Sequence, residues 1–208
     1  MIKTRPDFSF ERAAIQRGAS FVCGVDEVGR GPLAGPVTAA AVRLNPDDIP
    51  EGLDDSKKLS LKQREALAAE IHARADVCIA HATVQEIDDL NILRASHLAM
   101  TRAIAGLTPV PDHVLIDGNM IPRDLTLPAE AVIKGDARSL SISAASIVAK
   151  ICRDHVMLSL AQQHPGYGWE TNAGYPTKMH QNALRNLGVT PHHRQSFKPV
   201  HNILYQEK

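Results

Sequence analysis

Short apolar runs bounded by glycine or polar residues alternate along the chain with longer segments in which apolar residues recur every three or four positions. The short runs predict buried strands, and the periodic segments predict helices with one apolar face. Strands with helices between them indicate an α/β fold, in which a mixed sheet carries helices on both faces. We expect strands at residues 21–25, 37–44, 77–82, 113–116 and 131–133, and helices at about 60–75, 91–105, 143–163 and 178–187.

Local end signals agree with these helices. Ser60 and Gln63 have the spacing of a capping box, and Thr177 is the expected N-cap of the last helix. Gly106 and Gly188 follow the last apolar positions of two helices and predict their ends. No repeat or linker rich in Ser, Pro or Gly divides the sequence, so we expect one main domain with a C-terminal extension.

The composition narrows the class of protein. The chain has 208 residues, 44% of them hydrophobic, which can bury a sizeable core and excludes a fibrous or wholly disordered protein. The apolar stretches are too short to cross a bilayer, and the N-terminus lacks a signal-peptide pattern. Cys23, Cys78 and Cys152 lie far apart and form neither a disulfide framework nor a C-x-x-C pair. We therefore expect a cytoplasmic protein without a membrane partner.

The net charge is zero, but the charges are unevenly distributed. Residues 1–133 contain 14 basic and 19 acidic side chains, whereas residues 134–208 contain 9 basic and 4 acidic ones. An acidic body beside a basic region suits a protein that gathers carboxylates at one place and holds an anion next to them. Uneven decoration of the surface explains the same numbers equally well.

Four carboxylates, Asp26, Glu27, Asp117 and Asp136, stand at or just beyond the ends of predicted strands, each near glycine. Strand ends are where α/β sheets build sites. Neighbouring strand residues point to opposite faces, so Asp26 and Glu27 converge only if the chain twists or bulges there. Gathered acids would repel one another unless a cation lies between them, and ligation by oxygen alone favours Mg²⁺ or Mn²⁺ over zinc. Acids at strand exits are also common turn formers, so a single Asp-Gly pair is weak evidence.

Several blocks of sequence, taken together, carry a more specific signal. Residues 24–35 (GVDEVGRGPLAG), 55–59 (DSKKL), 115–119 (LIDGN), 134–136 (KGD) and 143–150 (SAASIVAK) closely resemble type 2 ribonuclease H, the bacterial ribonuclease HII family. Residues 174–177 (GYPT) and 194–197 (RQSF) extend the match to about residues 20–200. The resemblance implies a ribonuclease H-like mixed five-stranded sheet flanked by helices. It divides the chain into an N-terminal segment (1–19), a catalytic domain (20–165) and a small helical, substrate-contacting C-terminal extension (166–208).

The same resemblance implies an activity and a site. The expected reaction is endonucleolytic hydrolysis of the RNA strand of RNA–DNA hybrids and cleavage 5′ to single ribonucleotides in duplex DNA, giving 5′-phosphate and 3′-hydroxyl ends. Two divalent cations, Mn²⁺ or Mg²⁺, would be held by the catalytic acids Asp26, Glu27, Asp117 and Asp136. The ribonucleotide would be recognised through its 2′-hydroxyl by backbone groups of Gly29, Arg30 and Gly31, with Tyr175 packed against the sugar at the RNA–DNA junction.

Basic side chains add candidate phosphate contacts. Lys57 is the main one, and Lys58, Lys178, Arg185, Arg194 and Lys198 could neutralise further phosphates of a duplex, although solvated surface charge explains each separately. Adjacent histidines seldom chelate one ion, so His192 and His193 are expected to contact phosphate at most. Ser146, Lys150 and His180 could support the site from behind, but packing and helix-surface roles are commoner. Asp154 is placed to form an (i, i+4) ion pair with Lys150.

Alternatives stay open at this point. A DNA nuclease or junction resolvase could use the same fold and metals, and a binding module could use them without catalysis. A phosphate-cradling loop of the nucleotidase kind is disfavoured because no Gly-Lys-Ser follows the glycines. Ala173 stands where many ribonuclease HII relatives carry a basic residue, which removes one phosphate contact. We expect a monomer, and the tail by which some relatives bind the polymerase clamp is not evident, since residues 206–208 are too short to decide.

Overall fold

The computed structural model describes residues 5–205 and contains one mixed sheet of five strands in the order β3-β2-β1-β4-β5. The central strand β1 (Val22–Val28) is antiparallel to β2 (Val37–Leu44) and parallel to β4 (His113–Asp117). On the outside, β3 (Ala75–Ala82) is antiparallel to β2, and β5 (Ala129–Val132) is parallel to β4. The expected ribonuclease H-like sheet is therefore confirmed.

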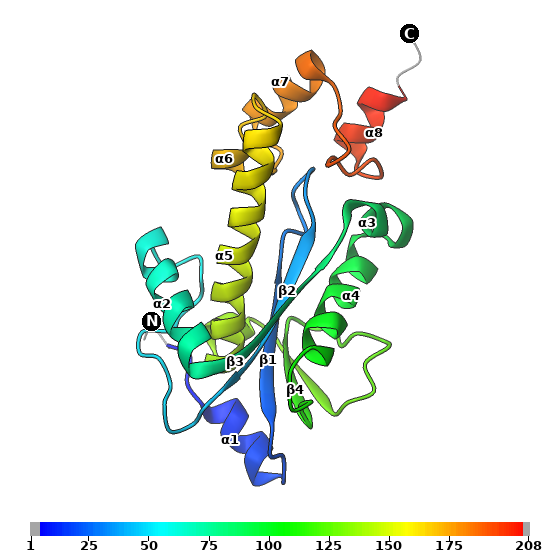
Figure 1. Cartoon of the computed structure of the whole chain (residues 1–208). Coiled ribbons are helices and arrows are strands. Elements are labelled where there is room, and N and C mark those ends of the chain that lie inside the picture. Colours follow the sequence, from blue (N-terminus) through cyan, green and yellow to red (C-terminus); the bar gives the residue numbers. More distant parts are fainter. Residues whose placement is uncertain (1–4, 206–208) are drawn as a thin grey trace.

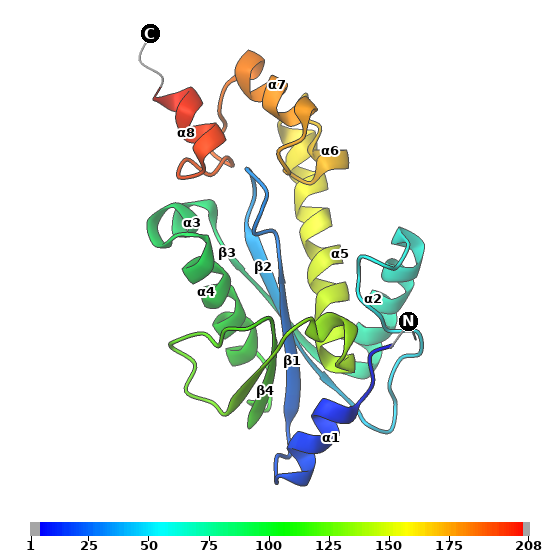
Figure 2. The same ribbon diagram turned by 180° about the vertical axis from the view of Figure 1, so that it is seen from behind.

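Helices cover both faces of the sheet (Figures 1 and 2). The long helix α5 (Leu140–Gln163) and α2 (Leu61–Arg74) pack on one face, and α3 (Val84–Leu90) and α4 (Ile92–Ala105) pack on the other. Side chains of β2 alternate between these two cores, because successive residues of a strand point to opposite faces. Ala39 and Ala41 contact the α4 side, whereas Ala40 and Val42 contact the α5 side.

The predicted helix caps are present. Ser60 and Gln63 form a reciprocal capping box at the start of α2, and the Thr177 side chain accepts a hydrogen bond at the start of α7 (Lys178–Leu187). Helix α5 begins three residues earlier than its apolar spacing predicts, because the side chain of Ser139 accepts the amide hydrogen of Ile142 and caps it.

Five short elements were not predicted: α1 (Ser9–Gln16), α3, the 3₁₀ turn η1 (Gly135–Ala137), α6 (Trp169–Asn172) and α8 (Lys198–Leu204). Each spans about two turns or fewer, which is too short for a periodic pattern to emerge. The C-terminal elements enclose a core around Trp169 that includes Leu160 of α5 and Leu33 of the glycine-rich loop. Contacts of this extension therefore reach back to the sheet.

The N-terminal segment is also tied to the rest of the fold. Glu11 of α1 is buried, and its Oε1 accepts hydrogen bonds from Ser139 Oγ at 2.6 Å and from the amide and hydroxyl of Ser141. Within residues 5–205, no helix combines the length and apolarity needed to span a membrane. The C-terminal tail considered for clamp binding, residues 206–208, lies outside the described residues.

Candidate active site

Asp26 and Asp117 lie side by side at the carboxyl ends of two parallel strands. Val25 of β1 pairs with Ile116 of β4, and the two aspartates are the next residues of their strands. The strand β1 is longer than predicted, so Asp26 and Glu27 stand within it and not beyond its end. Asp26 is 7% exposed and lies on the face covered by α5.

Glu27 reaches the same place without the expected bulge. Pairing of Gly24–Val28 with β2 is regular, so Glu27 points to the α4 face, opposite Asp26. The two side chains share one cleft because β4 ends at Asp117, which leaves this end of β1 unpaired on that side. Glu27 Oε1 pairs with Arg30 Nη1 at 3.2 Å.

Asp136 is brought in by a tight turn after β5. Lys134 adopts a left-handed conformation with φ of 56°, and η1 then directs two backbone amides at the Asp117 carboxylate. Asp117 Oδ1 accepts hydrogen bonds from the amides of Gly135 at 2.6 Å and Asp136 at 3.4 Å. The Asp136 side chain is 7% exposed and accepts a hydrogen bond from Lys57 Nζ at 3.0 Å.

The acids lie close enough to repel one another. Burial raises the pKa of Asp26 well above its usual value, and repulsion by Glu27 and Asp117 raises it further, while a hydrogen bond from Ser146 opposes the shift. Burial likewise raises the pKa of Asp117, with Asp136 the largest charge contribution. A bound cation would relieve this repulsion, and the donors are all oxygen, which suits a hard divalent ion.

The acids face a cleft of about 390 Å³ at this end of the sheet. Asp26, Glu27 and Asp117 line this cleft, whereas Asp136 is not among its lining residues. The other polar lining residues are Ser56, Lys57, Arg64, Ser146, Lys150 and Tyr175. Within residues 5–205, no three His, Cys, Asp or Glu side chains are gathered tightly enough to form a ready-made metal site. Ser146 and Lys150 thus lie at the cleft, and Lys150 also forms the expected ion pair with Asp154 at 2.8 Å.

The glycine-rich loop and Tyr175 form one wall beside the acids. A Cβ atom on Gly31 would lie 3.3 Å from Tyr175 Cε1, so the ring packs directly over this glycine. Gly29 has φ of +94°, and a Cβ there would lie only 2.2 Å from Arg153 Nε. Only glycine fits both the backbone conformation and the space at position 29.

Two buried arginines hold this loop, and sequence reasoning missed both roles. Arg194 donates hydrogen bonds to the carbonyls of Gly29 at 2.6 Å, Arg30 at 3.0 Å and Gly35. Its prediction as a phosphate contact is wrong, because the side chain is fully buried. Arg153 donates to the carbonyls of Ala34, Pro36 and Ala173. Its position four residues after Ala149, on the buried face of α5, was the available signal.

Two histidines of the extension, His180 and His193, are fully buried. The burial of His193 overturns its expected phosphate contact. His180 Nε2 accepts a hydrogen bond from Trp169 Nε1 at 3.0 Å and lies 3.1 Å from His193 Nε2. The other nitrogen of His180 lies 3.0 Å from the Tyr175 carbonyl, so this network supports the backbone of Tyr175. The half-buried His192 packs edge to face against His164.

The remaining predicted phosphate contacts are either paired with an acid or exposed on the surface. Lys58 pairs with Asp54 at 2.7 Å, and within residues 5–205 it forms no ion pair with any of the four acids. Lys178, Arg185 and Lys198 are exposed on α7 and α8. Among the predicted phosphate contacts, Lys57 is the one that forms an ion pair with a site acid, Asp136.

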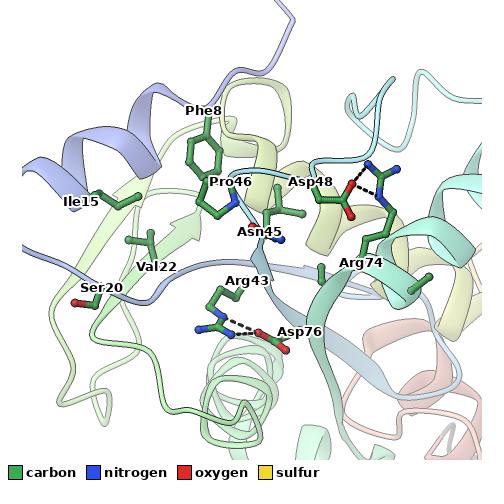
Figure 3. A pocket seen from close by; sticks show the side chains of 13 residues that line it. Phe8, Ile15, Ser20, Val22, Arg43, Asn45, Pro46, Asp48, Arg74 and Asp76 are labelled. Atoms are coloured by element: carbon green, nitrogen blue, oxygen red, sulfur yellow. Dashed lines mark hydrogen bonds and ion pairs between the residues drawn. The ribbon is translucent and has the colours of Figure 1, made fainter.

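A larger cavity, of about 580 Å³, lies at the opposite end of β1 (Figure 3). It is lined by residues of α1, α2 and the adjoining strand ends and contains none of the four acids. Its arginines are neutralised within it, Arg43 by Asp76 and Arg74 by Asp48. Size alone therefore does not mark the reactive site.

Comparisons with known proteins agree with the geometry. The family model for ribonuclease HII matches residues 23–200. A ribonuclease HII from Ruegeria sp. (strain TM1040) is 68% identical over 202 residues, covering 97% of this chain and 88% of the relative.

Solved structures extend the agreement to the fold. The crystal structure of ribonuclease H2 from Pyrococcus horikoshii OT3 is 26% identical, with a TM-score of 0.75 over 90% of this chain and 98% of that chain. The ribonuclease HII of a PCNA complex from Archaeoglobus fulgidus is 25% identical, with a TM-score of 0.73 over 86% and 96%. The chain belongs to the ribonuclease HII family, whose members are endoribonucleases that act on RNA–DNA hybrids.

Proposed function

We propose that the chain hydrolyses the RNA strand of RNA–DNA hybrids and cuts 5′ to single ribonucleotides in duplex DNA through Asp26, Glu27, Asp117 and Asp136. The observation that carries this proposal is the pairing of β1 with β4, which sets Asp26 beside Asp117 in the cleft that Tyr175 borders. Family membership supports the endoribonuclease class. The residue roles, the position of the cut and the 5′-phosphate and 3′-hydroxyl products are our assignments.

The four acids would hold two divalent cations, Mn²⁺ or Mg²⁺, on which this family depends. Such cations, when bound, lower the pKa of an attacking water and stabilise the departing 3′ oxygen. Asp26 and Asp117 are suited to bridging or shared ligation because they are adjacent and both repelled by their neighbours. Lys57 holds a positive charge against Asp136 and is placed to meet the phosphate backbone at the edge of the cleft.

Selection of ribonucleotides would depend on the loop beneath Tyr175. The only group that distinguishes the two sugars is the 2′-hydroxyl, which both donates and accepts a hydrogen bond. Arg30 and Gly31 are exposed and Tyr175 packs over Gly31, whereas Gly29 is buried against Arg153 and sets the course of the loop. We assign these residues to sugar recognition, and residues 166–208 to a substrate-contacting extension of a monomer. Free cysteines fit the reducing cytoplasm.

The decisive experiment compares two duplexes that differ by one 2′-hydroxyl. We expect the protein with Mn²⁺ or Mg²⁺ to cut the duplex with a single ribonucleotide on its 5′ side, and to leave the all-DNA duplex intact. Mapping of the product ends should give 5′-phosphate and 3′-hydroxyl. Equal cutting of both duplexes would show a DNA nuclease, and binding without any turnover would show a binding module.

A further inference from the structure

A second groove lies on the face of the sheet opposite α5. It has a volume of about 430 Å³ and lies between α4 and the loop that connects β4 to β5. The lining combines apolar side chains with a cationic edge. Leu93, Leu98 and Met120 lie on the apolar side, and Arg94, His97 and Arg123 lie on the polar side.

Two arginines of this groove carry positive charge that no acid neutralises. Arg94 and Arg123 are both exposed, and within residues 5–205 neither side chain forms an ion pair or hydrogen bond. Asp124 is the one carboxylate among the lining residues. Burial and the charges of Arg30 and Arg123 lower the pKa of His97, while Asp124 opposes this shift. The groove is therefore net positive and suited to an anion.

Charged side chains link the groove to the active site past the carboxyl end of β1. Glu27 points to the α4 side and pairs with Arg30, whose charge in turn reaches His97. The loop that forms the other wall begins directly after Asp117. If the scissile phosphate of a nucleic-acid strand lies at the acids, one flank of that strand would lie in the cleft with Tyr175. The other flank would lie in this groove.

We propose that the groove is a second backbone-binding subsite, in which Arg94 and Arg123 hold phosphates of the cut strand on the side of the scissile phosphate away from Tyr175. Guanidinium groups pair with phosphate oxygens in a fork geometry, and Leu93, Leu98 and Met120 offer apolar contact to a sugar or base. The inference rests on the proposed function, because it takes the acids as the position of the scissile phosphate.

The test is a salt titration of binding with the double variant Arg94→Gln, Arg123→Gln. Duplexes with one ribonucleotide are extended on both sides, or shortened on the 5′ or the 3′ side, and binding is measured by fluorescence anisotropy in chelator. On the extended duplex we expect the slope of log Kd against log salt to fall by about 2 in the variant. Shortening the duplex on the side that reaches the groove should lower the slope for the wild-type protein by a similar amount. The same shortening should not change the slope for the variant.

The control is Arg12→Gln, Arg17→Gln, which removes two positive charges from α1 and its C-terminal end, at the other end of the sheet, where Arg17 pairs with Glu130. It should keep the wild-type slope. An unchanged slope in the groove variant, or an equal loss on duplexes shortened at either side, would overturn the subsite. Ribonucleotide-selective cutting by the wild-type protein is scored separately, so a failure of the subsite can be distinguished from a failure of the proposed function.

Discussion

The Asp117 carboxylate is held by the turn that follows β5. Its Oδ1 accepts the Gly135 amide at 2.6 Å, and an asparagine oxygen could keep that bond while losing the charge. We expect Asp117→Asn to lower turnover by at least ~100-fold and to leave duplex binding nearly unchanged, because it removes a ligand and not a phosphate contact. Its free energy of unfolding in chelator should stay equal or rise, since repulsion with Asp26 is relieved.

Steady-state cleavage and urea unfolding measure the two effects. The exposed Asp89→Asn provides a control with the same chemical change outside the cleft. Turnover retained by Asp117→Asn would remove this residue from the site.

Tyr175 is 42% exposed, so its ring contributes little to the core and is free to meet a substrate. We expect Tyr175→Ala to lower kcat/KM at a single ribonucleotide by about 10-fold or more, as loss of an aromatic packing contact with a nucleotide does. The free energy of unfolding should change by less than about 1 kcal/mol. Tyr205→Ala, at an exposed position directly after α8, is the matched control. A larger effect on stability than on cleavage would make Tyr175 a packing residue.

Substitution of Arg194 should affect stability more than that of Tyr175, because the hydrogen bonds of its side chain go to backbone carbonyls of the protein. Lysine cannot reach the carbonyls of Gly29, Arg30 and Gly35 together, so Arg194→Lys leaves buried acceptors unpaired. We expect a loss of about 2–4 kcal/mol in the free energy of unfolding and a lower kcat/KM for ribonucleotide cleavage. Urea unfolding checks the first effect, with the exposed Arg185→Lys as control. Wild-type stability in Arg194→Lys would contradict this role.

At the scale of elements, α6 and α7 are joined by histidines that must remain neutral. Burial, with a smaller contribution from His180, lowers the pKa of His193 to about 3. The unfolded chain takes up a proton near pH 6.5, whereas the folded chain does not until about pH 3, so stability is lost as the pH falls through this window. We expect His193 to account for a loss on the order of 3 kcal/mol in the free energy of unfolding between pH 7 and pH 4.

Urea unfolding as a function of pH tests this linkage. His193→Asn should flatten the pH dependence below pH 6.5, even if its stability at pH 7 is lower. His201→Gln, at an exposed position of α8, should keep the wild-type slope. Equal slopes in all three proteins would show that His193 does not control acid stability.

At the scale of the whole molecule, metal binding should stabilise the fold. Cations that bind only the folded state add RT ln(1 + [L]/Kd), which is about 2.7 kcal/mol at one hundred times Kd. For a domain of this size we expect Mn²⁺ to raise the Tm by about 5–10 °C over chelator. The Asp26→Asn, Asp117→Asn double variant should show no such shift, whereas the exposed Asp47→Asn should keep it. A shift that persists in the double variant would place the ion elsewhere.

The sequence determined the elements and the chemistry of the site, whereas only the tertiary structure decided which residues meet. Apolar spacing and caps are local properties, so the boundaries of β2 and α7 and the caps Ser60 and Thr177 could be predicted from neighbouring residues. Burial depends on contacts between distant segments: Arg194 reaches Gly29 across 165 positions of sequence. For that reason its charge indicated a phosphate contact, and only the packed fold shows that it holds the glycine-rich loop.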